Sequence, residues 1–284
     1  MKERSTRCPP KLRILSALLV FAMLLTLLPV TAFAETRYKT VGNVKYVQYD
    51  GAIIWRVIEY SGSESSLTLE SQIYGQNVQI IDKGVFKGNT TLTHVRLPQG
   101  LFMDIYEEAF AGCTNLETVV APATLGDVGK RAFQGCTKLK SLALGRNSAH
   151  IYESAFEGCT SLKSIEITGT MVYIDDTAFK GCTNLTSVKL PKYLEEMGNN
   201  VFEGCTSLEE ITLPKEIREF GDNVFAGCTN LKKIIYNGKP TDWANCPAKG
   251  KIPANVKVEF AVPLTEYKIS VCGTTVNEAN YSDV

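Results

Sequence analysis

The chain has 284 residues, of which 30 are basic and 30 acidic, so its formal net charge is zero. This balance excludes the strongly basic composition of nucleic-acid-binding proteins and of proteins that dock on anionic membranes, and we expect neither partner. The length would ordinarily suggest one or two globular domains. A repeat array grows lengthwise, however, so its length does not indicate a number of domains.

Residues 1–34 have the pattern of a secretory signal peptide. Basic residues at the start precede an apolar run from Ile14 to Val30, and Ala32-Phe33-Ala34 supplies a small-residue cleavage site. An uncleaved membrane anchor is the alternative, although a membrane span usually needs about 20 apolar residues. We therefore expect a secreted protein with no membrane insertion after cleavage.

Residues 35–66 lack the repeat that follows and are predicted to form an N-terminal cap. The segment from Tyr46 to Val57 has two apolar stretches on either side of an Asp50-Gly51 turn, which predicts a β-hairpin. A solenoid exposes its core at each end, so an atypical terminal unit is expected there.

Residues 67–236 contain a repeat with a fixed interval. Near-copies of Ala-Phe-x-Gly-Cys-Thr-x-Leu return every 23 residues, and an imperfect copy at Phe86 has Asn89 in place of the cysteine. A period of about 20 to 29 residues is typical of leucine-rich repeats, in which each coil contributes one short strand. The repeated cysteines are Cys113, Cys136, Cys159, Cys182, Cys205 and Cys228.

The apolar residues within each coil predict two sides. A Leu-x-x-Val-x-Leu pattern, as in Leu139, Leu142 and Leu144, ends in the alternation of a strand with one buried face. A second apolar column, to which Ile151 belongs, lies five residues before each phenylalanine and begins the return side of the coil. We predict a mainly β, right-handed leucine-rich-repeat solenoid of 23-residue coils with N- and C-terminal caps.

The 23-residue repeat ends after Leu231. Turn residues, Trp243 and an alternating segment up to Phe260 predict a C-terminal cap over residues 237–262. Residues 263–284 contain another short strand pair between Tyr267 and Val276. We expect this pair to be the start of a further small β module; if it is, the protein continues past Val284.

The assembled motif Ala-Phe-x-Gly-Cys-Thr-x-Leu-x-x-Val-x-Leu-Pro resembles the BspA-like leucine-rich repeat family, the Treponema-type repeat of bacterial surface proteins. The resemblance covers about residues 66 to 236. It implies a bacterial protein that is secreted or displayed on the cell surface, as members of the family are. It also implies a binding role, because family members act as adhesins or binding proteins for host proteins and other cells. It supplies no catalytic residue and no ligand identity.

The cysteine ladder invites a disulfide or metal interpretation. Stacked rungs about 4.8 Å apart fall within the Cα range of a disulfide, but equivalent side chains point the same way. We therefore predict free, buried thiols that act as small hydrophobes. A ladder cannot gather four sulfurs around one zinc ion, so no metal is expected. A bridge between Cys228 and Cys246 in the C-terminal cap is left open.

Catalysis is not expected within residues 35–284. The two histidines, His94 and His150, fall in different parts of their coils, so neither is predicted to serve as a base for a nucleophile. Acid pairs such as Glu107-Glu108 suggest glycosidase carboxylates, but adjacent residues point in different directions and are predicted to be solvated. No phosphate-binding glycine loop is present in the sequence, and we expect no cofactor.

The outward columns of the repeat strand are the candidate binding surface. Stacked coils would turn them into a ribbon some 30 Å long, whose small, hydroxyl-rich centre suits binding of a protein segment or a glycan. The alternative is that these residues are merely solvent-facing. The predicted ligand-binding residues are Thr118, Ser141, Ser164, Glu166, Ser187, Lys189 and Glu210.

The sequence thus predicts a secreted or cell-surface protein, monomeric, that binds host or bacterial surface proteins or glycans. The first alternative is a structural spacer that presents a downstream domain. The second is the non-catalytic part of a larger cell-wall or glycan-acting enzyme.

Overall fold

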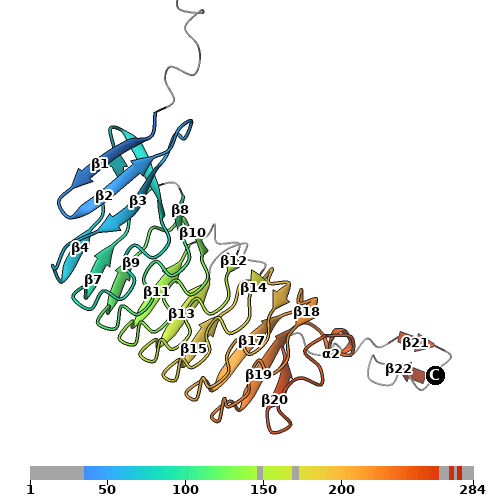
Figure 1. The fold of residues 1–284 in the computed structure, drawn as a ribbon. Coiled ribbons are helices and arrows are strands. Elements are labelled where there is room, and N and C mark those ends of the chain that lie inside the picture. The colour runs from blue at the N-terminus through green and yellow to red at the C-terminus, as the bar shows by residue number, and fades with distance from the viewer. Residues whose placement is uncertain are drawn as a thin grey trace, which may run out of the picture.

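A computed structural model describes residues 35–100, 102–145, 150–167 and 173–261, together with the backbone of residues 269–271 and 274–276. The predicted signal peptide lies outside the described residues. The described chain is nearly all β, with one short helix, α2 (Pro240–Trp243). Its coils stack side by side into an elongated array with β1 near one end and β20 near the other (Figure 1), which confirms the predicted mainly β solenoid.

One side of the array is a sheet that we call the return sheet. Its first three strands are antiparallel, and from β3 onward each coil adds one parallel strand. In order, the strands are β1 (Arg37–Val41), β2 (Val44–Gln48), β3 (Trp55–Tyr60), β6 (Gln76–Ile81), β8 (Met103–Ile105), β10 (Leu125–Val128), β12 (His150–Ile151), β14 (Tyr173–Ile174), β16 (Glu196–Met197) and β18 (Glu219–Phe220), with β5 (Gln72–Ile73) paired to β6.

The other side carries the Leu-x-x-Val-x-Leu strands, and we call their outward surface the strand face. Six strands form one parallel sheet and three form a second. The first contains β4 (Ser66–Thr68), β7 (His94–Arg96), β9 (Thr118–Val120), β11 (Ser141–Leu144), β13 (Ser164–Ile167) and β15 (Ser187–Lys189); the second contains β17 (Glu210–Pro214), β19 (Lys233–Asn237) and β20 (Lys257–Phe260).

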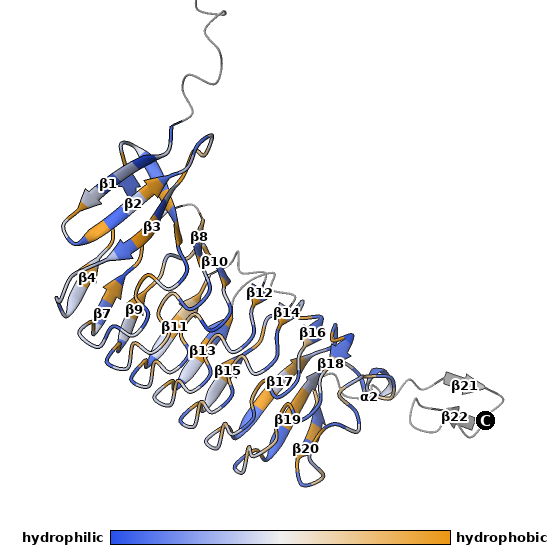
Figure 2. Ribbon diagram, in the orientation of Figure 1, coloured by the Kyte–Doolittle hydropathy of each residue, from blue (hydrophilic) through white to orange (hydrophobic). Residues whose placement is uncertain are grey.

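Hydrophobic and hydrophilic residues alternate along these strands (Figure 2). In β11, Leu142 and Leu144 are buried whereas Ser141 and Ala143 are exposed. Because side chains alternate between the faces of a strand, one face of each short strand supplies the core and the other faces solvent.

The repeated phenylalanines form a column of stacked rings through the core. Neighbouring ring centroids lie 4.8 to 5.9 Å apart and neighbouring planes differ by 9° or less. These distances are typical of favourable stacked aromatic pairs. The 23-residue interval therefore puts each ring directly on the ring of the preceding coil. The column consists of Phe86, Phe110, Phe133, Phe156, Phe179, Phe202 and Phe225.

The corner between the phenylalanine and the cysteine needs glycine. Gly135 has φ of 71° and Gly158 has φ of 72°, in the left-handed region that other residues adopt at a cost. The amide of Gly135 also donates to the carbonyl of Glu157 in the next coil, at 2.8 Å. The Phe-x-Gly-Cys motif thus sets both the turn and the contact to the next coil.

The N-terminal cap contains one strand more than the predicted hairpin. The strands β2 and β3 flank the Asp50-Gly51 turn as expected, and β1 pairs with β2 on the outer side. Trp55 and Tyr46 are buried, and the indole of Trp55 donates to the side-chain oxygen of Gln76 at 3.3 Å. These large rings cover the first coil, as a terminal unit of a solenoid must.

The C-terminal end is covered by an aromatic cluster. The ring of Tyr236 lies 5.0 Å from that of Trp243 and 6.4 Å from that of Phe260. The Nζ of Lys251 donates to the carbonyl of Phe220, 2.6 Å away, at the last strand of the return sheet. Further along, β21 (Ile269–Val271) and β22 (Thr274–Val276) pair as the predicted short antiparallel hairpin.

Candidate functional site

The seven predicted binding residues lie on the strand face. The register pairs Thr118 with Ser141, Ser141 with Ser164, and Ser164 with Ser187, so four hydroxyl side chains form one column across four strands. The three serines are exposed, and Thr118 is half-buried. Parallel strands in register place each hydroxyl about 4.8 Å from the next. The role of these residues in binding stays a prediction.

The strand face is not one continuous hydrogen-bonded sheet along its whole length. The predicted residue Glu210 lies on β17, which belongs to the three-stranded sheet rather than to the sheet that ends with β15. The strand face therefore has a six-stranded part, which holds the hydroxyl column, and a three-stranded part next to the C-terminal cap.

Charged residues on the strand face pair with one another across coils. The Nζ of Lys189 lies 2.5 Å from the carboxylate of Glu166, which joins two of the predicted binding residues. In the three-stranded part, Lys233 lies 2.8 Å from Glu210 and 3.8 Å from Glu259. The charges within each pair neutralise one another, so the hydroxyl column beside Glu166 and Lys189 is a polar surface without strong net charge.

A shallow hollow of about 490 Å³ lies at the C-terminal part of the strand face. Its walls come from four successive coils, and Glu210 is the lining residue that belongs to the predicted ligand-binding set. The series Glu210, Lys233 and Lys257 at one position of consecutive coils is a charged pattern in the sequence that could have found it. The lining residues are Thr186, Glu209, Glu210, Lys232, Lys233 and Lys257.

The histidines lie on opposite sheets. His94 is exposed on β7, and its Nδ1 is 2.8 Å from the hydroxyl of Thr93. His150 is on β12 of the return sheet, where its Nε2 lies 2.6 Å from a carboxylate oxygen of Asp175. The structure therefore does not bring the two histidines together.

The seven cysteines among the described residues are free and buried, as predicted for the repeat cysteines. Each of the six repeat thiols donates to the carbonyl oxygen of the phenylalanine in the preceding coil, at 3.0 to 3.2 Å. Burial raises the pKa of Cys182 to about 12 and that of Cys228 to about 11. A thiol that keeps its proton is a poor nucleophile. Cys228 and Cys246 are both free thiols, without the bridge that was left open.

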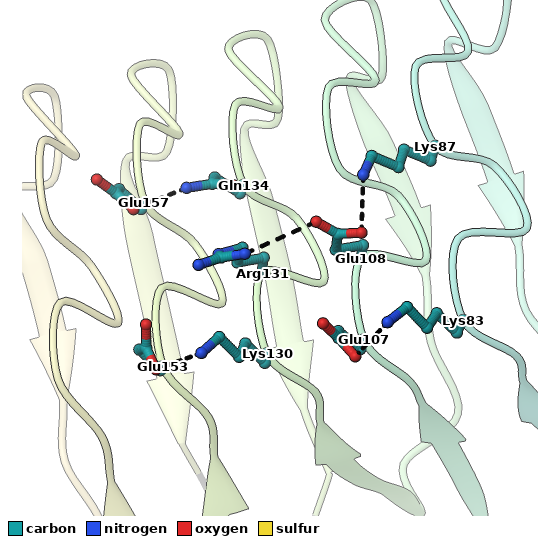
Figure 3. Close-up of polar contacts among 9 residues, drawn as sticks. All are labelled: Lys83, Lys87, Glu107, Glu108, Lys130, Arg131, Gln134, Glu153 and Glu157. Carbon is teal, nitrogen blue, oxygen red and sulfur yellow. Dashed lines mark hydrogen bonds and ion pairs between the residues drawn. The ribbon is translucent and has the colours of Figure 1, made fainter.

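The acid pair Glu107-Glu108 was predicted to be simply solvated, but both carboxylates bind lysines of the preceding coil. Glu107 lies 2.8 Å from Lys83, and Glu108 lies 2.7 Å from Lys87 and 3.9 Å from Arg131 (Figure 3). The Lys87 ammonium lowers the pKa of Glu108 through its hydrogen bond. The two carboxylates thus link coils, and the lowered pKa of Glu108 is the opposite of what a general acid requires.

Two further classes of site are absent from the described part of the chain. Among these residues, no three His, Cys, Asp or Glu side chains gather in a way that could hold a metal ion. Likewise, no helix in this part is long and apolar enough to cross a membrane.

The family assignment depends on the 23-residue coils, the phenylalanine column and the cysteine column. The family described as the BspA type leucine rich repeat region matches in six copies, over residues 58–171 and 149–245. The chain belongs to this family. No curated protein matches the BspA-type chain.

Several solved structures of leucine-rich repeat proteins are similar to this BspA-type chain. A leucine rich repeat protein of T. pallidum is 20% identical, with coverage of 80% of this chain and 83% of that chain and a TM-score of 0.37. A leucine rich cell surface protein of Faecalibacterium prausnitzii is 16% identical, with coverage of 80% and 96% and a TM-score of 0.34. The pneumococcal vaccine antigen PcpA is 15% identical, with coverage of 85% and 92% and a TM-score of 0.31.

Proposed function

We propose that this BspA-type protein is a secreted, surface-displayed binding module that holds an extended segment of a protein or glycan on its strand face. The observation that carries the proposal is the column of Thr118 and the exposed Ser141, Ser164 and Ser187, one hydroxyl on each of four successive strands. Solenoids commonly bind partners along such regular extended faces.

The chemistry of the column supports binding more than catalysis. Each hydroxyl is both a donor and an acceptor, so a row of them serves a partner that presents amides or sugar hydroxyls at regular intervals. The neighbouring charges of Glu166 and Lys189 are satisfied by one another. Adhesion to host or other cells is the biological role that we propose for this binding, and absence of catalysis within the chain stays a prediction.

The test is binding of the full chain to an array of host matrix proteins and glycans, compared with a variant in which Ser141, Ser164 and Ser187 are changed to Lys. Three lysines would place bulk and like charges along the column. We expect saturable binding by the wild type and at least a tenfold loss in the variant, measured by surface plasmon resonance.

A matched control adds the same charge away from the strand face. Thr114, Asn184 and Asn230 are exposed residues at the corners after the repeat cysteines, and the variant with all three changed to Lys should bind as the wild type does. Equal loss in both variants, or no binding to any member of the array, would contradict the proposal. The second outcome would favour a structural spacer.

A further inference from the structure

Away from the strand face, two exposed tyrosines of the return sheet stand on either side of a glycine. Tyr106, Gly129 and Tyr152 directly follow β8, β10 and β12, and each amide donates to the strand of the preceding coil in the same way. They therefore occupy one position in three successive coils. With about 4.8 Å for each rung, the two tyrosines are about 9.6 Å apart along the array.

Gly129 leaves the space between the tyrosines open. A Cβ at this position would lie 2.8 Å from the amide of Glu107 and 2.8 Å from the carbonyl of Ile105, so the close approach of the coils demands glycine. The result is a slot of about 380 Å³, lined by Tyr106 and Tyr152 together with Asp104, Asp127, Glu107 and Lys130.

Each tyrosine ring has a side-chain partner that does not line the slot. The guanidinium of Arg56 lies 4.9 Å from the ring centroid of Tyr106 and comes from β3, on the N-terminal side of that ring. The ring of His150 stacks on Tyr152 at 3.9 Å, and its Nε2 is fixed by Asp175 of the next coil, 2.6 Å away. The two rings are thus preorganised as walls, with 38% of Tyr106 and 37% of Tyr152 exposed.

The lining of the slot has more acidic than basic side chains. Asp104 and Asp127 lie at neighbouring rungs, and Asp104 accepts a hydrogen bond from the amide of Asp127 at 3.0 Å. Burial raises the pKa of Tyr152, and the charges of Asp127, Asp175 and Asp104 raise it further. The Nζ of Lys130, the cation in the lining, is bound by Glu153 at 2.6 Å (Figure 3).

We propose that the slot between Tyr106 and Tyr152 binds a quaternary ammonium group. A cation midway between the rings would lie about 4.8 Å from each ring position, within the roughly 6 Å over which an aromatic face attracts a cation. The carboxylates of Asp104 and Asp127 add charge complementarity. A neutral sugar ring would also fit the width, but it needs donors as well as acceptors, and this lining is dominated by acceptors. The proposal is independent of binding on the strand face.

The experiment is calorimetric titration of the full chain with choline, together with 3,3-dimethyl-1-butanol, which has the same shape without the charge. We expect choline to bind at least tenfold more tightly than the neutral alcohol, because the attraction is electrostatic. A peptide with a trimethyllysine side chain, titrated in parallel, distinguishes a protein-borne ammonium from a small-molecule headgroup; tighter binding of the peptide would assign the former.

Variants tie the binding to the slot. Tyr106→Leu and Tyr152→Leu should each weaken choline binding at least fivefold, and Asp104→Asn should weaken it less. Tyr193→Leu removes another exposed tyrosine, outside the slot, and should leave choline binding unchanged. Circular dichroism establishes that each variant is folded. Equal binding of choline and its neutral analogue, binding of glucose or N-acetylglucosamine in preference to choline, or no binding of either ammonium ligand would overturn the proposal.

Discussion

The thiol of Cys159 donates a hydrogen bond to the carbonyl oxygen of Phe133, 3.2 Å away in the preceding coil. The same relationship links Cys182 to Phe156 at 3.2 Å. The cysteine of each repeat therefore does more than fill space, because it joins its coil to the one before through a buried polar contact. A thiol is a weak donor, and the column adds up many such contacts.

Replacing Cys159 tests whether this contact stabilises the array. Cys159→Ala removes both the buried sulfur and the donor, and we expect a loss of about 1 to 2 kcal/mol in the free energy of unfolding. Cys159→Ser keeps a donor, so its loss should be smaller. Urea unfolding followed by circular dichroism measures both. A serine variant no more stable than the alanine variant would mean that the sulfur acts by packing alone.

The buried thiols also predict a loss of stability at high pH. Burial raises the pKa of Cys182 from its ordinary 9.0 to about 12, so the folded chain keeps this proton at a pH where the unfolded chain releases it. The resulting stabilisation is fully present below about pH 9 and is lost as the pH rises toward 12. The stability difference between wild type and Cys182→Ser, a side chain that does not titrate, should therefore shrink between about pH 9 and 12. A difference that stays constant over this range would count against the raised pKa.

The repeat made most of the fold predictable from the sequence. The interval between Phe156 and Cys159 recurs in every complete coil, and the alternation of Ser141 with Leu142 fixes which side of the strand is buried. A parallel stack with one residue directly above its equivalent then gives the register of the strand face. The phenylalanine column and the hydroxyl column both follow from this geometry.

The strand β1 was not predictable in the same way. Arg37 and Tyr38 are exposed, and its residues lack a clear buried face because the strand lies at the edge of the sheet. Only its pairing with β2 defines it, and such pairing leaves little trace in a hydrophobic pattern.

The ion pairs and the aromatic slot depend on residues that vary from coil to coil. The pair between Lys83 and Glu107 requires a particular long side chain in each of two coils, which periodicity does not specify. The slot arises because Gly129 falls between Tyr106 and Tyr152 at one position of three coils. Alignment of the coils at 23 residues places these three in one column, so a signal existed in the sequence.

Lys251 is predicted to stabilise the last coil of the return sheet locally. Its Nζ donates to the carbonyl of Phe220 at 2.6 Å and lies 2.9 Å from Asp222, where a further coil would otherwise supply the partner. Lys251→Met keeps most of the stem but removes the donor, and we expect a loss of about 1 kcal/mol after allowance for solvent exposure. Hydrogen exchange should quicken at Gly221 but not at Gly129. The exposed Lys249→Met serves as the control, and an equal effect from it would contradict the capping role.

The phenylalanine column predicts that the stability lost on substitution of a phenylalanine depends on the position of its coil in the array. Phe156 stacks on Phe133 at 5.4 Å and on Phe179 at 5.2 Å, whereas the terminal Phe225 has one stacked neighbour at 5.9 Å. Each stacked pair contributes about 1 kcal/mol beyond burial of its area. Phe156→Leu should therefore destabilise the protein by about 1 kcal/mol more than Phe225→Leu, as measured by urea unfolding. Because each coil contacts only its neighbours, the central substitution should also broaden the transition by uncoupling the two halves of the array. Equal losses at the two positions would show that side-chain volume, and not the stack, determines the cost.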